Sequence, residues 1–161
     1  MNLLNSNDFW QFACQLYSED GMQARLLDYQ NLQGKNVNLC LLLYYLDSLN
    51  LAINQTQLSK LEQSISEFEQ QVLKPLRTTR AYLKTIQTEI TDYAAIRKAL
   101  LGAELKLEKQ QQIILIDVVN SMDLTACSTP NNSDKYLAWF FTIIFIISLI
   151  LWILARNIRG Y

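Results

Sequence analysis

The chain has 161 residues with 14 basic and 15 acidic side chains, and it contains no histidine. The missing histidine excludes the commonest general base, the Ser-His-Asp and Cys-His arrangements and every zinc or di-iron site that uses histidine. Half of the residues are hydrophobic and only four glycines and two prolines occur, so we expect one compact all-α domain. The first 135 residues carry 12 basic and 15 acidic residues, and a net charge of −3 gives no bias toward nucleic acid.

The first 33 residues predict two helices. A first helix is expected to begin at a cap among residues 6–8, because its apolar positions then recur at helical spacing. A second helix is expected from residue 19 or 20 to Gln33, where Gly34 can adopt the left-handed conformation that ends a helix.

A third helix is expected from Val37 to Leu49, with Asn36 or Asn38 as its cap. Its sequence is apolar nearly all round, which in a small domain marks a central helix that its neighbours surround.

Apolar residues from Leu58 to Leu76 recur at steps of three and four and predict an amphipathic helix after a polar break at 50–57. Pro75 either kinks this helix or begins a new one, and we favour a kink or short break. A long last helix is expected from Ala81 to about Met122. The predicted fold is therefore a compact bundle of about five helices.

Three cysteines, Cys14, Cys40 and Cys127, are widely spaced and follow no known metal-ligand spacing. The first two lie in apolar helical patterns and are expected to be small core residues of a reducing compartment. Cys127 could be acylated, although a free thiol in a loop explains it more simply.

Residues 1–122 are thus expected to form the helical domain and the polar residues 123–135 a linker. Residues 136–155 contain no charge and, at about 1.5 Å of rise per residue, match the roughly 30 Å of a bilayer core. They predict a single transmembrane helix, followed by a short basic tail at 156–161.

The orientation of this span is less constrained. The N-terminus has no basic region or apolar core of a signal peptide, which favours a cytoplasmic domain anchored by its tail in a bacterial inner membrane. Lys135 before the span and two arginines after it point the other way by a single charge.

Four strings occur in the order FWQFACQLYSEDG, LLDYQNLQGKNVNLCLLLYYL, VLKPLRTTRAYL and AIRKALLGAELKLEKQQQ. Together they resemble the proteobacterial family called domain of unknown function 2390, over about residues 8–112. The resemblance implies a small helical bacterial protein with no established activity. Members of that family are usually read as soluble, so the C-terminal span would be an addition here.

Two polar features are candidate contact sites. Lys74, Arg77, Arg80 and Lys84 form a basic run that could touch anionic lipid headgroups or nucleic acid phosphates, although a solvated helix face also explains it. Asn38, Arg77 and Arg97 could converge on a small anion, but a helix cap and salt bridges explain them equally well.

No catalytic residue, cofactor or metal is expected. The leading hypothesis is a non-enzymatic, membrane-anchored interaction or scaffold module, whose partners are the lipid bilayer and another protein rather than nucleic acid. A module that binds a small ligand or anionic lipid is the alternative. An enzyme built without histidine ranks third.

Overall fold

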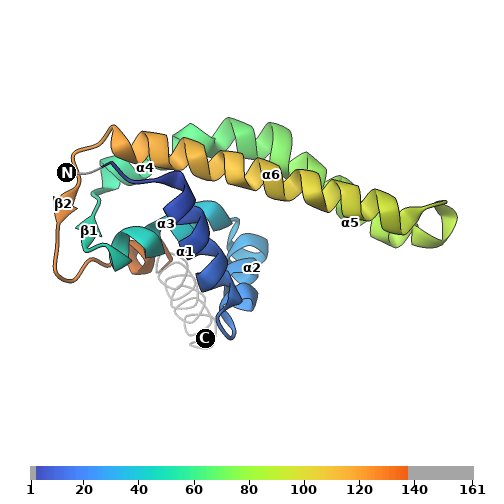
Figure 1. The fold of residues 1–161 in the computed structure, drawn as a ribbon, viewed down its shortest axis with the longest axis horizontal. Helices are drawn as coiled ribbons and strands as arrows, with labels where there is room; N and C mark the ends of the chain where they lie inside the picture. Colours follow the sequence, from blue (N-terminus) through green and yellow to red (C-terminus); the bar gives the residue numbers. More distant parts are fainter. Residues whose placement is uncertain (1–2, 138–161) are drawn as a thin grey trace, which may run out of the picture.

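The computed structural model describes residues 3–137, which form a mainly helical domain (Figure 1). The all-α class is confirmed. The α-helices are α1 (Ser6–Ser18), α2 (Met22–Gln33), α3 (Val37–Ser48), α4 (Gln55–Phe68), α5 (Lys74–Thr85) and α6 (Tyr93–Asn120). Two short strands, β1 (Leu51–Ala52) and β2 (Thr125–Ala126), pair antiparallel.

The central helix is α3, as its sequence predicts. Eight of its residues are buried, and α1, α2 and α6 pack around it. The ring of Tyr45 lies 5.4 Å from that of Phe9 and 5.2 Å from that of Phe12, both on α1. A helix that is apolar on nearly every face needs such neighbours on every side.

The ends of the first helices follow their capping residues. The side chain of Asn5 caps α1, so the expectation of a cap at residues 6–8 is wrong by one position. Gly34 ends α2 with a φ of 64° and donates its N–H to Gln30, which confirms the predicted stop. Asn36 caps α3 by accepting a hydrogen bond from Leu39 at 3.0 Å.

The predicted break near Pro75 is also confirmed. A π-helical turn, Glu69–Leu73, joins α4 to α5, and Pro75 lies in the first turn of α5. At that position the proline ring removes an N–H that the start of a helix leaves unpaired in any case.

The long helix expected from Ala81 to Met122 is wrong, because the chain reverses direction between Thr85 and Tyr93. A 3₁₀ turn, Gln87–Glu89, fills part of this gap, and Asp92 adopts a left-handed φ of 58° before α6 begins. Aspartate tolerates this conformation better than most residues. The apolar spacing continues through the turn, so periodicity alone does not reveal it.

The reversal places α5 beside α6 as a helical hairpin that extends away from the other helices (Figure 1). We call residues 74–103 the arm, and residues 3–73 together with 104–137 the body. No residue of the arm is buried, whereas α6 contributes six buried residues from Glu104 onward.

Residues 123–137 pack onto the rest of the body. Strand β2 pairs with β1, residues 132–137 are helical, and Tyr136 and Leu137 are buried in the core. Strand pairing and apolar burial thus hold this segment against the helices. The division of the chain into domain, linker and span stays a prediction.

The transmembrane helix predicted at 136–155 lies outside the described residues except for Tyr136 and Leu137, and so does the tail at 156–161. Within residues 3–137, no helix has both the length and the hydropathy that a bilayer crossing requires.

The three cysteines are free thiols. Cys40 is fully buried, as expected, and burial raises its pKa to about 12. Cys14 is exposed, so its expected place in the core is wrong. The backbone N–H of Cys127 donates to Asn50 at 2.9 Å, and its side chain is partly exposed.

Candidate functional site

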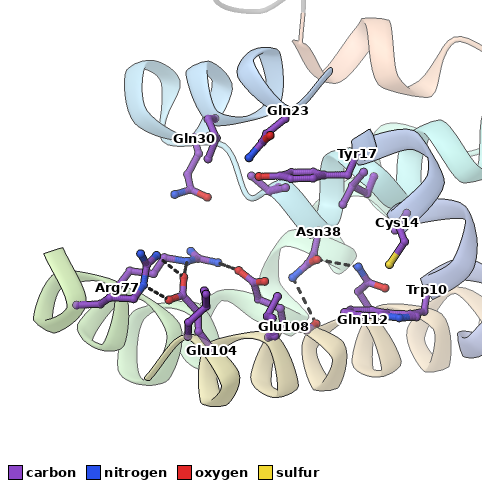
Figure 2. A pocket seen from close by; sticks show the side chains of 17 residues that line it. Trp10, Cys14, Tyr17, Gln23, Gln30, Asn38, Arg77, Glu104, Glu108 and Gln112 are labelled. Atoms are coloured by element: carbon purple, nitrogen blue, oxygen red, sulfur yellow. Dashed lines mark hydrogen bonds and ion pairs between the residues drawn. The ribbon is translucent and has the colours of Figure 1, made fainter. Parts of the chain in front are cut away.

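A cleft of about 640 Å³ lies where the arm joins the body. Helices α1, α2 and α3 line one side of it, and α5 and α6 line the other. Figure 2 shows Gln23 and Gln30 of α2 across the cleft from Arg77 and Glu104. Five helices therefore contribute side chains to one concave surface, which is the usual form of a ligand site.

Arg77 is the centre of a charged cluster in this cleft. Its guanidinium lies 2.7 Å from Glu69, 2.9 Å from Glu108 and 3.4 Å from Glu104. Arg80 contacts Glu104 at 2.5 and 3.1 Å. Arg77 and Arg80 are three residues apart on α5, so they lie on one face of that helix. Glu104 and Glu108 are four residues apart on α6 and likewise share one face. Three carboxylates against two guanidiniums leave one net negative charge.

Burial and these contacts oppose each other in setting the pKa values. Burial alone lowers the pKa of Arg77, but the hydrogen bond to Glu108 and the charges of Glu69, Glu108 and Glu104 raise it above the ordinary value. Burial also raises the pKa of Glu108, and the bond to Arg77 only partly offsets this. A nearby positive charge, such as that of Arg77, therefore stabilises the ionised form of Glu108.

Amide side chains extend the cluster toward α3. The amide of Asn38 donates to Gln111 at 2.9 Å and to the carbonyl of Glu108 at 3.4 Å, and its oxygen accepts from Gln112 at 2.9 Å. Glu69 accepts from the amide of Gln111 at 3.2 Å. All three amide residues are buried, so the network supplies hydrogen bonds that burial would otherwise remove.

The structure brings three of the six predicted contact residues to the cleft. Asn38, Arg77 and Arg80 line it, but the two arginines are paired with carboxylates. Lys74, Lys84 and Arg97 lie outside the cleft on exposed positions of the arm. Asn38, Arg77 and Arg97 thus do not meet at one point.

The acidic and amide members of the cluster were not predicted as site residues. Glu104 and Glu108 stand four residues apart, and three consecutive glutamines follow at 110–112, all within a helix that is otherwise apolar on one side. Polar residues on the apolar side of a helix are a signal of a buried network. Glu69 has no comparable signal, because it is the first residue of the π-helical turn, which sets the direction of its side chain.

Among residues 3–137, no group of three or more His, Cys, Asp or Glu side chains is arranged to hold a metal ion. Guanidiniums lie between the carboxylates of the cluster and neutralise two of them. The arrangement is suited to holding polar groups of a bound molecule rather than a cation between bare carboxylates.

Comparison with known proteins gives one match. The family described as "Protein of unknown function (DUF2390)" matches residues 8–115, which include most of α1, all of α2 to α5 and most of α6. No curated protein and no solved structure matches the chain. The matched region contains every residue of the charged cluster and the whole arm.

Proposed function

Because the chain belongs to the DUF2390 family of proteins of unknown function, which brings no activity with it, we propose a role from the geometry alone. The protein is a non-enzymatic interaction module that binds an acidic surface of a partner protein through its arm. Residues 138–155, which follow Tyr136 and Leu137 of the core, hold it at the bacterial inner membrane, with the domain on the cytoplasmic side.

The main support for this role is that no residue of the arm is buried. Most of the stability of a protein helix comes from packing of its apolar face, and a hairpin of 30 residues without a buried side chain lacks much of that packing. Apolar side chains remain open to solvent there: Tyr82 is 62% exposed and Ile96 is 40% exposed. A partner that covers these side chains would supply the missing burial.

The charge of the arm supports an acidic partner. The arm carries six basic and two acidic residues, whereas the body carries six basic and thirteen acidic ones. Arg77 and Arg80 are paired with glutamates. The other four basic residues are exposed and make no ion pair within residues 3–137: Lys74, Lys84, Arg97 and Lys98. Complementary charge on the partner would orient it and speed its association.

The test compares two double variants of the full chain, purified from membranes in detergent. Lys84→Glu with Arg97→Glu reverses two charges of the arm, and Lys60→Glu with Lys135→Glu reverses two exposed charges of the body. We expect the arm variant to weaken binding of the co-purified partner about tenfold or more, as lost charge complementarity does, and the body variant to bind as the wild type does. Salt should weaken wild-type binding, since exposed charges are screened.

Equal partner binding by both variants would place the interface elsewhere. Salt-sensitive binding of the wild type in nanodiscs, but not of the arm variant, to vesicles of anionic lipid without protein would show that the arm binds a lipid surface instead of an acidic protein. All substituted side chains are exposed, so circular dichroism and thermal unfolding should confirm that each variant keeps its fold.

Membrane attachment has its own test. We expect the full chain to stay with membranes after alkaline washing, and residues 1–135 to resist protease in intact spheroplasts. Digestion of the domain in intact spheroplasts would show that it lies on the other side of the membrane. Release of the chain by the wash would show that it is not anchored by a transmembrane segment.

A further inference from the structure

The cleft between the arm and the body offers a binding site that the contact role of the arm does not use. Its volume of about 640 Å³ lies within the usual range for small-molecule pockets. One part of its lining is apolar and another is polar, so the chemistry of a fitting molecule can be read from the two parts separately.

The apolar part is open to solvent. Leu27 of α2 is 37% exposed, and Leu101 and Leu105 of α6 are 38% and 48% exposed, and all three line the cleft. Trp10 and Tyr17 of α1 lie on the same surface. An aromatic or aliphatic group placed here would remove these side chains from water, which is favourable in proportion to the area covered.

The polar part contains a buried acceptor without a donor. The amide nitrogen of Asn38 donates to two acceptors, the side-chain oxygen of Gln111 and the carbonyl of Glu108. The oxygen of Asn38 must therefore accept from Gln112, which fixes the nitrogen of Gln112 toward Asn38. The side-chain oxygen of Gln112, Oε1, has no hydrogen-bond donor among residues 3–137.

The side chain that carries this oxygen lines the cleft. Gln112 is only 3% exposed, yet it lines the cavity, and Figure 2 shows its carboxamide near Cys14 and Trp10. A buried acceptor without a donor is unfavourable, and a bound N–H group would satisfy it.

The charges of the cleft disfavour an anionic ligand. Arg77 and Arg80 already pair with Glu104 and Glu108, and Glu69 adds a further negative charge behind Arg77. An anion would have to compete with these carboxylates for the guanidiniums. A neutral or positively charged donor would not.

We infer that the cleft binds a small molecule with an aromatic or aliphatic body and a neutral or cationic N–H donor, which donates to Oε1 of Gln112. Binding occurs at the base of the arm, in a site distinct from the exposed basic residues Lys84 and Arg97.

Four probes with one phenylpropyl body separate these requirements: 3-phenylpropanamide, 3-phenylpropylamine, 3-phenylpropanoate and methyl 3-phenylpropanoate. The amide and the amine bring a donor, the acid brings a negative charge, and the ester brings neither. Binding is followed on the full chain in nanodiscs by the NMR signal of the Trp10 indole N–H, and titration of empty nanodiscs corrects for partition of each probe into the bilayer.

We expect saturable shifts at Trp10 with the amide and the amine, and at least tenfold weaker binding of the acid and the ester. Gln112→Met should remove the preference for the amide over the ester. Leu105→Asn should weaken all probes, whereas Leu32→Asn, at a position of α2 that is 71% exposed and outside the cleft, should leave them unchanged.

Equal binding of the acid and the amide would show an anion site and overturn the inference. Equal binding of the ester and the amide, a tenfold amide preference that survives Gln112→Met, or no saturable shift at Trp10 with any probe would also overturn it. Because Gln112→Met also removes a hydrogen bond to Asn38, Leu105→Asn at an exposed position provides an independent check.

Discussion

One carboxylate oxygen of Asp47 accepts two hydrogen bonds from Asn132, at 2.9 Å from its backbone N–H and at 2.7 Å from its side-chain amide. The other oxygen accepts from the backbone N–H and the hydroxyl of Ser133, at 3.0 and 2.6 Å. A residue near the end of α3 thus caps a helix that begins 85 positions later. This cap fixes the segment that leads to the predicted membrane span.

Asp47→Ala should destabilise the domain and loosen this segment. The change leaves two backbone N–H groups and two side-chain donors without their acceptor, so we expect a loss of about 2–3 kcal/mol in the free energy of unfolding. Urea unfolding measures the loss, and limited proteolysis within residues 123–131 measures the loosening.

The control for this variant is Asp123→Ala, because Asp123 is exposed and its side chain makes no hydrogen bond or ion pair among the described residues. It should unfold within about 0.5 kcal/mol of the wild type. If Asp47→Ala behaves in the same way, the bonds to Asn132 and Ser133 do not stabilise the fold.

Arg77→Met should destabilise the domain by about 2–4 kcal/mol, because it leaves Glu69, Glu104 and Glu108 close together without the central guanidinium. Lys74→Met removes an exposed charge from the same helix and should change stability little. Thermal or urea unfolding compares the two variants. Similar stabilities would mean that water or the protonation of a carboxylate replaces the guanidinium.

Elements that depend on local signals could be predicted from the sequence. The apolar run of α3, the stop at Gly34 and the break near Pro75 each follow from residues within a few positions. The turn at 86–92 could not be predicted in this way, because apolar residues continue through it at helical spacing. Its reversal is set by the packing of α5 against α6.

The candidate site was harder to predict because it depends on contacts between distant residues. Asn38 and Arg77 could be selected as polar residues in conspicuous strings, but most of their partners lie on α6, and Glu69 lies in the π-helical turn. The hydrogen bond from Asn38 to Gln112 spans 74 positions, and no local pattern indicates it. The same holds for Asp47 and Asn132, which is why residues 123–135 resemble a free linker.

The cysteines should differ in reactivity. Cys40 is fully buried and burial raises its pKa to about 12, so its thiolate is scarce at pH 8 and iodoacetamide cannot reach it. Cys14 is exposed and Cys127 is partly exposed. Mass spectrometry of the native chain should find both of these alkylated and Cys40 alkylated only after denaturation. Rapid labelling of Cys40 in the native chain would show that α3 opens readily.

The stability of the domain should depend on the ionisation of Glu108. Burial, which is the largest effect, and the charges of Glu104 and Glu69 raise its pKa above 4.5, although Arg77 lowers it. The folded chain therefore binds the proton of Glu108 more tightly than the unfolded chain does. The resulting stability is fully present below about pH 4.5 and is lost as the pH rises through the higher pKa of the folded state.

Glu108→Gln removes this titration. The free energy of unfolding of the variant minus that of the wild type should therefore increase as the pH rises above 4.5 and level off beyond the folded pKa. Urea unfolding at half-unit steps from pH 4 to 8 measures the difference, and Glu67→Gln, at an exposed position of α4, provides the comparison for an unburied carboxylate. A difference that decreases with pH would mean that the bond between Arg77 and Glu108 outweighs burial, and the cleft would then hold Glu108 as a stable anion.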